Sequence, residues 1–208
     1  MTNLQKRILT SLIILPLSFF FIIKGGHLLF FFLVTVFCLA NYELFSCFKK
    51  VYTILIINLI LILSLFSIYY LSNQNLASFL LLLWVIILTV FSDIGGYIFG
   101  KFFKGPKLSK LSPNKTISGA LGSLILSCVT IFFTLYYLTK NFDLLILLIG
   151  CLISISCQVG DLFFSFLKRK SNLKDTSNFL PGHGGLLDRV DGILFGLPVG
   201  FFTLIMIY

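Results

Sequence analysis

Three aspartates in the second half of the chain have the spacing expected of a binding site for a hard cation. Asp188 and Asp191 lie three positions apart and would share one face of a helix. Asp161, Ser165 and Lys168 follow at intervals of four and three, so a carboxylate, a hydroxyl and an ammonium group would point the same way. A set of oxygen ligands favours Mg²⁺ over zinc. The pattern therefore predicts that Asp161, Asp188 and Asp191 bind Mg²⁺.

The polar segment around Asp188 also offers donors for phosphate. In "PGHGG", residues 181–185, glycines flank His183 and allow the close backbone approach in which successive N–H groups bind an anion. The alternative is a plain turn, an interfacial histidine and basic residues that only orient the chain in a membrane. Cations, carboxylates and this histidine occur within 31 residues, which favours phosphate binding. The cations are Lys168, Arg169, Lys170, Lys174 and Arg189.

A second polar segment, residues 101–119, precedes the first one. Lys115 and Thr116 pair an ammonium group that could reach a phosphate with a hydroxyl donor. Ser118 could cap the helix that follows, and the N-terminal end of a helix attracts anions. We therefore predict a second phosphate-binding element here.

The elements that must position these residues are transmembrane helices. Hydrophobic residues make up 58% of the chain and charged residues 11%, whereas a soluble domain carries about 25% charged residues. A span needs about 20 apolar residues, and a β-barrel would show short alternating segments instead of continuous runs. We predict one all-α transmembrane domain, 1–208, with N-terminal helices in 1–71 and a catalytic part in 76–208. Its seven spans, a count that could be wrong by one, are Ile8 to Ile23, Leu28 to Phe45, Val51 to Leu71, Leu76 to Ile94, Ala120 to Leu138, Leu144 to Leu167 and Gly192 to Tyr208.

The charge distribution predicts which membrane face carries the site. With the N-terminus inside, fourteen of the sixteen lysines and arginines fall on the cytoplasmic side. The net charge of +9 then implies anionic partners at that face, and we expect no nucleic acid among them. Asp93 and Asp161 each lie seventeen residues after the start of a span, or about 26 Å along a helix. Asp191 directly precedes the last span, so we expect the carboxylates in one plane at the cytoplasmic edge. For Asp93 alone, a helix-end charge at the interface is an equal alternative.

A resemblance to a known family rests on longer motifs. The stretch "SFLKRKSNLKDTSNFLPGHGGLLDRVD", Ser165 to Asp191, resembles the signature of the phosphatidate cytidylyltransferases, or CDP-diacylglycerol synthases. "SDIGGYIFGK" and "LSPNKTISGALG" resemble the middle segment of that family, and "QKRILTSLI" and "NYELF" are fainter similarities near the N-terminus. The chain departs from the family at Ser118 and Phe164, where glutamates are usual, and at Ile117, where an aromatic residue is common.

The resemblance implies an activity: CTP and phosphatidate give CDP-diacylglycerol and pyrophosphate, with Mg²⁺ and room for a second cation. The enzyme would lie in a bacterial inner membrane, among membrane lipids, with its site on the cytoplasmic face. Asp161, Asp188 and Asp191 would serve the metal. The catalytic residues would be Lys168, Arg169, Asp175, His183 and Arg189. The substrate-binding residues would be Ser112, Lys115, Thr116, Ser165, Lys174, Gly184 and Gly185.

Other interpretations compete with this one. A cation-coupled transporter could use Asp93 and Asp161, but the outer halves of the helices offer only scattered Ser, Thr and Asn. A catalytically inactive relative would fit the two missing glutamates. Separately, Gly192, Gly196 and Gly200 are spaced four apart and predict a packing face for a neighbouring helix or for a second subunit in a homodimer.

Overall fold

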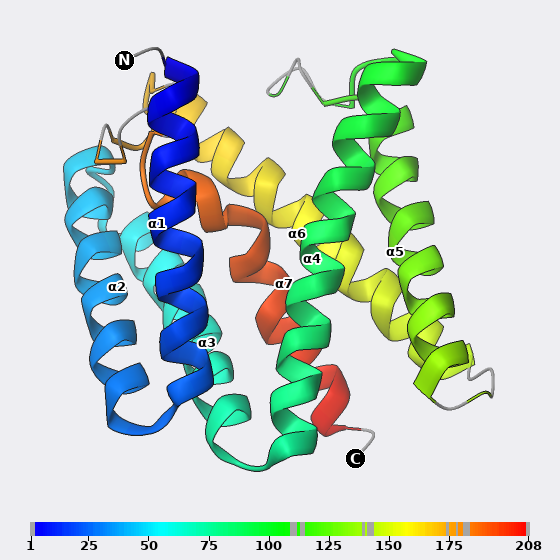
Figure 1. Ribbon diagram of the computed structural model, residues 1–208. Helices are drawn as coiled ribbons and strands as arrows, with labels where there is room; N and C mark the ends of the chain where they lie inside the picture. The colour runs from blue at the N-terminus through cyan, green and yellow to red at the C-terminus, as the bar shows by residue number, and fades with distance from the viewer. Residues whose placement is uncertain are drawn as a thin grey trace. The chain divides into compact units, whose positions relative to one another are not determined.

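The structure is a computed structural model that describes residues 3–108, 112, 115–138, 140, 144–173, 175–177, 179–180 and 184–206. The described residues form seven α-helices (Figure 1), and their only β-pairing is two isolated bridges. The all-α prediction is therefore confirmed. The helices are α1 (Asn3–Lys24), α2 (Gly26–Cys47), α3 (Val51–Asn73), α4 (Leu76–Phe103), α5 (Ile117–Leu138), α6 (Leu144–Lys170) and α7 (Leu187–Ile205).

Six of these helices, α1 to α6, are long and apolar enough to cross a membrane. Lipid offers no hydrogen-bond partners to the backbone, so each span satisfies its own polar groups as a helix. The exception is α7, which begins with the charged residues Asp188, Arg189 and Asp191. Its uncharged part, 192–205, is about 21 Å long, less than the hydrocarbon thickness of about 30 Å. The protein is thus a polytopic integral membrane protein.

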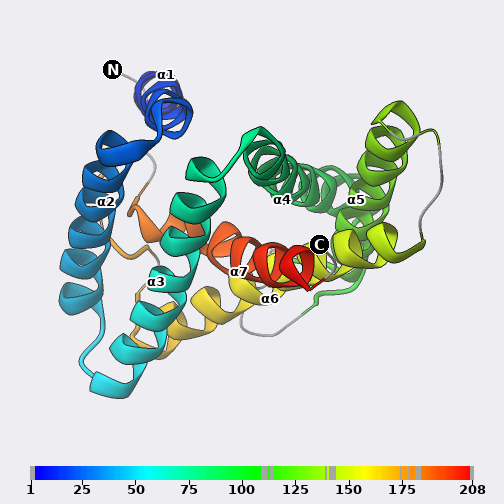
Figure 2. The ribbon, with the colours of Figure 1, turned by 90° about the horizontal axis from the view of Figure 1, so that it is seen from below.

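The chain divides into two compact units. The first unit comprises Met1–Leu82 and Leu167–Asp191, and the second comprises Leu83–Phe166 and Gly192–Tyr208. In the first unit α1, α2 and α3 lie side by side, as Figures 1 and 2 both show. Leu29 and Leu44 of α2 and Ile57 of α3 are completely buried in this unit.

In the second unit, glycines bring α4 and α5 into backbone contact. A Cβ atom at Gly95 would lie 2.5 Å from the carbonyl oxygen of Gly122, and one at Gly119 would lie 2.8 Å from the carbonyl oxygen of Gly96. Small residues allow helices to approach this closely within a membrane. The sequence had predicted that the span ends at Ile94, but α4 continues to Phe103 through these glycines.

The glycine stripe of α7 packs against helices of its own chain. Gly192 contacts Asp161 and Gly196 contacts Cys157, both on α6, while Gly200 lies against Val85 of α4. Of the two predicted alternatives, the neighbouring helix is therefore the one that the structure shows. The proposed homodimer through Gly192, Gly196 and Gly200 is not supported, because this face is already covered.

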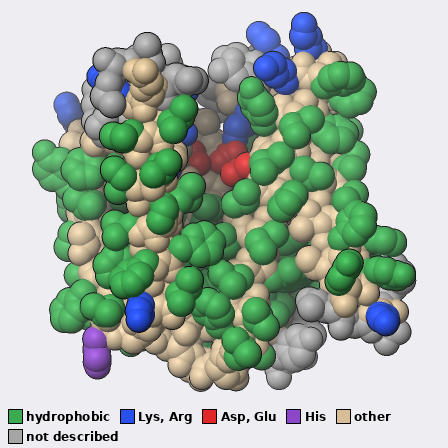
Figure 3. Space-filling model, in the orientation of Figure 1, with side chains coloured by type: hydrophobic (Ala, Val, Ile, Leu, Met, Phe, Trp, Pro, Cys, Tyr) green, Lys and Arg blue, Asp and Glu red, His purple; other side chains and the backbone are tan. Residues whose placement is uncertain are grey.

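The outward surfaces of the helices are apolar. Figure 3 shows hydrophobic side chains over the visible faces of α1 and α4. Leu12 of α1 is 68% exposed and Phe102 of α4 is 80% exposed. Such extensive exposed apolar surface is unfavourable in water and favourable in lipid.

Candidate functional site

The second unit contains a polar cavity of about 250 Å³ lined by α4, α6, the start of α5 and the connection that precedes α5. Within it, Lys115 Nζ forms an ion pair with Asp161 Oδ2 at 2.7 Å. Two predicted residues, one expected to bind phosphate and one expected to bind metal, thus meet in one site. The lining consists of Asp93, Gly96, Tyr97, Leu108, Lys115, Thr116, Gly119, Ala120, Ser123, Gln158 and Asp161.

The connection between α4 and α5 positions Lys115 by folding back on itself. Lys107 and Thr116 form an antiparallel bridge, and the N–H of Leu108 donates to the carbonyl of Lys115 at 2.8 Å. The N–H of Lys115 in turn donates to the carbonyl of Ser112 at 3.1 Å. Ser112, a predicted substrate-binding residue, therefore lies beside Lys115, which lines the cavity. These backbone bonds fix the start of α5 and direct the Lys115 side chain to α6.

The N-terminal cap of α5 is Thr116 and not Ser118, so the cap predicted from the sequence is wrong by two positions. Thr116 Oγ1 accepts the N–H of Gly119 at 3.1 Å, the usual bond of an N-cap residue. Ser118 Oγ instead accepts the N–H of Gly105 at 3.2 Å and bonds Thr116 Oγ1 at 3.0 Å. Ser118 therefore ties α5 to the residues that follow α4.

Asp93 lines the same cavity as Asp161. Both helices begin where the sequence predicted, α4 at Leu76 and α6 at Leu144, so both aspartates lie at the same distance along their helices. Asp93 is therefore a residue of the candidate site, and the helix-end alternative does not describe it fully. The prediction placed Asp161 but not Asp93 among the metal ligands, because a helix-end charge was an equal alternative for Asp93.

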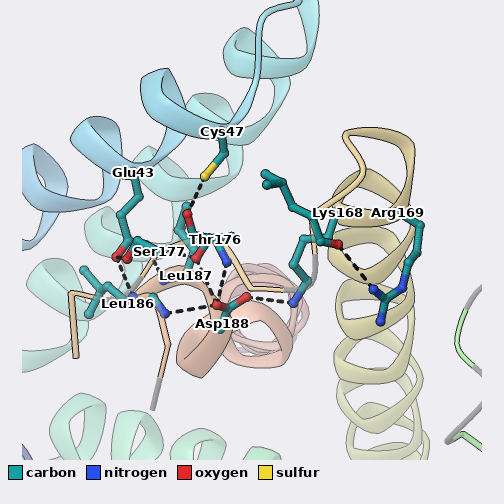
Figure 4. A network of polar contacts seen from close by, with 11 residues as sticks. Glu43, Cys47, Lys168, Arg169, Thr176, Ser177, Leu186, Leu187 and Asp188 are labelled. Atoms are coloured by element: carbon teal, nitrogen blue, oxygen red, sulfur yellow. Dashed lines mark hydrogen bonds and ion pairs between the residues drawn. The ribbon is translucent and has the colours of Figure 1, made fainter. Parts of the chain in front are cut away.

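The first unit holds a separate network around Asp188, shown in Figure 4. Asp188 Oδ1 pairs with Lys168 Nζ at 2.7 Å, and both side chains are largely buried. Asp188 Oδ2 accepts the N–H groups of Thr176 at 2.8 Å and of Gly185 at 3.0 Å. Gly185 of the predicted glycine-rich anion site donates its N–H to the chain's own carboxylate, so phosphate binding by this segment stays a prediction.

The electrostatics of Asp188 follow from these contacts. Burial opposes the ionised form, but the hydrogen bond from the Lys168 ammonium and those from the Thr176 and Gly185 N–H groups outweigh it. The pKa of Asp188 therefore lies below the ordinary carboxyl value. The group is a carboxylate at neutral pH, which is the form that a cation or an ammonium group requires.

Sequence reasoning missed Glu43, which joins this network from α2. Glu43 is the single glutamate of the chain and only 1% exposed. Its carboxylate accepts the N–H groups of Leu186 at 2.7 Å and Leu187 at 3.0 Å and the hydroxyl of Ser177 at 2.7 Å. A lone acidic residue at the end of an apolar span was the signal that could have found it, since such a residue needs partners.

The other residues predicted for the site differ in their exposure and in their contacts. Arg169 Nη1 donates to the carbonyl of Leu173 at 3.3 Å, and Asp175 and Arg189 are exposed. Ser165 and Asp191 are half-buried, and Gly184 has a φ of 87° beside Asp188. Lys174 and His183 lie outside the described residues, so their predicted roles stay predictions.

The metal prediction is likewise not decided by this geometry. Asp161 belongs to the second unit, and Asp188 and Asp191 belong to the first. Within each unit, the described His, Cys, Asp and Glu residues form no group of three that could hold a metal ion. The Mg²⁺ site therefore stays a prediction.

One of the departures from the family pattern is explained by packing. Phe164 of α6 is completely buried, and its ring contacts Phe163 and Phe195 edge-on or nearly so. A carboxylate at this position would be costly among aromatic rings. Phe164 thus belongs to the apolar core of the second unit.

The chain combines apolar membrane spans with two buried or half-buried lysine–aspartate pairs. These features define a membrane protein that can bind anions near the bilayer. The model of the family described as "Cytidylyltransferase family" matches residues 49–207. The chain belongs to this family.

Individual relatives agree with this assignment. The chain is 32% identical over 215 residues to "Phosphatidate cytidylyltransferase" of Rickettsia felis, covering 98% of this chain and 93% of the relative. It is 33% identical to the protein of the same name from Rickettsia bellii, covering 97% and 90%. Similarity to the Helicobacter pylori protein of that name is higher, 41% over 116 residues, but the chain spans only 43% of that relative's length.

Proposed function

We propose that the protein transfers the cytidylyl group of CTP to phosphatidate and releases pyrophosphate. The observation that carries the proposal is that Lys115–Asp161 and Lys168–Asp188, both at 2.7 Å, lie on the segments matched by the family model. The names of the relatives supply the substrates. The product is CDP-diacylglycerol, a precursor for phospholipid synthesis.

The reaction brings two anions together. A phosphoryl oxygen of phosphatidate attacks the α-phosphorus of CTP, a new P–O bond forms, and the bond to the β-phosphate breaks so that pyrophosphate leaves with its electron pair. Charge neutralisation and in-line positioning are the main contributions that a protein makes to such a transfer. Lys115 and Lys168 are the cations placed for this role, and the Thr116 hydroxyl lines the same cavity as Lys115.

The chemistry of the donor set suits Mg²⁺, which prefers carboxylate oxygens. Asp161, Asp188 and Asp191 are the residues that we propose to hold it. When bound, the cation would neutralise charge on the phosphates. Asp188 Oδ2 accepts three donors, and Oδ1 pairs with Lys168. Lys168 and Lys115 would neutralise charge on the phosphates beside the aspartates with which they pair.

The location follows from the two substrates. Phosphatidate stays in the bilayer because each CH₂ of its chains contributes about 0.8 kcal/mol to membrane partition, whereas CTP is soluble in water. The site must lie where the two phases meet. The basic ends of α4 and α6, which carry Lys101 and Lys168, Arg169 and Lys170, support the cytoplasmic face of a bacterial inner membrane.

The test is transfer of radiolabel from CTP into lipid by the purified protein in detergent. We expect labelled CDP-diacylglycerol only when both phosphatidate and Mg²⁺ are present. Lys168→Met should abolish most of the transfer, whereas Lys49→Met, which removes an exposed lysine, should not change it. If folded wild-type protein forms no labelled lipid, the chain is an inactive relative and the proposal fails.

A further inference from the structure

The buried carboxylate of Glu43 is surrounded by hydrogen-bond donors. Beyond its bonds to Leu186, Leu187 and Ser177, Glu43 Oε2 lies 3.3 Å from the hydroxyl oxygen of Thr176. Four donors from a distant part of the chain therefore converge on one side chain of α2. Burying an ionised carboxylate is costly unless such donors compensate it.

Two of these donors are backbone N–H groups at the start of α7. The first N–H groups of a helix have no partner within the helix, and the helix dipole favours an anion beside them. Glu43 supplies this anion from α2. Gly185 makes the approach possible, since a Cβ atom there would lie 2.8 Å from Glu43 Oε2 and would overlap the Thr176 hydroxyl.

The Thr176 hydroxyl connects Glu43 to Asp188, and Figure 4 shows it between them. Thr176 Oγ1 is 3.0 Å from Asp188 Oδ2 and 3.3 Å from Glu43 Oε2. A hydroxyl has one proton to donate, so the two carboxylates share it. The backbone N–H of Thr176 bonds the same oxygen of Asp188 at 2.8 Å. Thr176 therefore contributes two of the contacts that orient the Asp188 carboxylate.

We propose that Glu43 is a positioning residue of the site: it holds Thr176 and the start of α7 so that Asp188 presents Oδ1 to Lys168. The positioning of Asp188 by Glu43 does not depend on the proposed function. Only the effect of that positioning on catalysis rests on it. The geometry itself involves residues of the first unit alone. Glu43 would not touch substrate, and its effect would pass through Asp188 and Lys168.

A capping role alone makes a different prediction. If Glu43 only stabilised the start of α7, its loss would lower the amount of folded protein and leave each folded molecule unchanged. If Glu43 positions Asp188, its loss alters the Lys168–Asp188 pair in molecules that remain folded. Misplacement of a reacting group by about 1 Å can cost about a hundredfold in rate, so the second effect is measurable.

The experiment compares Glu43→Gln, Thr176→Val and Thr176→Ser with the control Ser46→Ala. Ser46 is exposed on the same helix, and its hydroxyl donates to the Glu43 backbone carbonyl at 2.8 Å. The first readout is the rate at which an amine-reactive reagent acylates Lys168 relative to the exposed Lys49, measured by mass spectrometry well below the unfolding midpoint. We expect Glu43→Gln and Thr176→Val to raise this ratio severalfold, and Thr176→Ser and Ser46→Ala to leave it at the wild-type value.

The second readout is kcat per folded molecule in the CTP assay. We expect Glu43→Gln to lower kcat by about tenfold or more, with Thr176→Ser retaining the activity that Thr176→Val loses. A wild-type labelling ratio in Glu43→Gln or in Thr176→Val would overturn the positioning role. Absence of product from the wild type would refute the proposed function instead, and the labelling ratio would still decide the role of Glu43.

Discussion

The two lysine–aspartate pairs have the same length, 2.7 Å, but differ in burial, and this difference predicts different energies. The side chains of Lys168 and Asp188 are 12% and 4% exposed, whereas those of Lys115 and Asp161 are 31% and 26% exposed. Breaking a buried pair by removing one partner costs about 3–5 kcal/mol, because the other charge is left uncompensated. A pair screened by solvent contributes about 1 kcal/mol or less.

We therefore expect Lys168→Met to lower the free energy of unfolding by about 3 kcal/mol, at the lower end of that range because Asp188 retains three donors on Oδ2. Lys115→Met should lower it by about 1 kcal/mol or less. The assay is unfolding by SDS in mixed micelles, followed by circular dichroism. Methionine keeps the apolar part of the lysine side chain and removes its charged end, so each variant reports mainly the ion pair.

A double variant provides the internal control. Lys168→Met combined with Asp188→Asn should be less destabilised than the sum of the two single variants, because no unpaired charge then remains. Equal destabilisation by Lys168→Met and Lys115→Met would refute the reasoning. So would strict additivity in the double variant.

Three further predictions concern pH and glycine packing. Because the pKa of Asp188 is lowered in the folded state, its stabilising contribution is complete above the unfolded value of about 3.9 and is lost as the pH falls through the folded pKa. Thermal unfolding of the wild type should therefore become more acid-sensitive below about pH 4 than that of Asp188→Asn. Gly185→Ala should reduce the folded yield, measured by gel filtration, since its Cβ would overlap the Thr176 hydroxyl. Gly122→Ala should lower the unfolding midpoint because its Cβ would overlap the Phe99 side chain on α4, whereas a midpoint equal to that of the wild type would contradict the close α4–α5 contact.

Much of the fold was predictable because the membrane restricts the choices. Each continuous apolar run had to be a helix, and each predicted span corresponds to one of the seven helices of the described residues. The end of α4 was not predictable from Gly95 and Gly96, because glycine pairs usually mark turns. Only the facing glycines of α5 show why the helix continues there.

The candidate residues of each unit were predictable where they lie close together in the sequence. Asp188 follows a dense polar segment, and Lys168 shares a helix with Asp161, so local spacing identified them. Glu43 lies 143 residues before Leu186, its backbone partner, and no local pattern connects them. The cap of α5 was misassigned for a related reason. Thr116 and Ser118 are both good caps by residue type, and only the backbone geometry distinguishes them.

The distance between Glu43 and its partners has a consequence for biosynthesis. At about 5–20 residues per second, a ribosome needs roughly 7–30 s to translate the 143 residues that separate Glu43 from Leu186. For most of that interval α2 has been made while the donors for its carboxylate have not. A nascent chain that stalls before residue 176 therefore carries this acidic group beside an apolar span without any of its four donors.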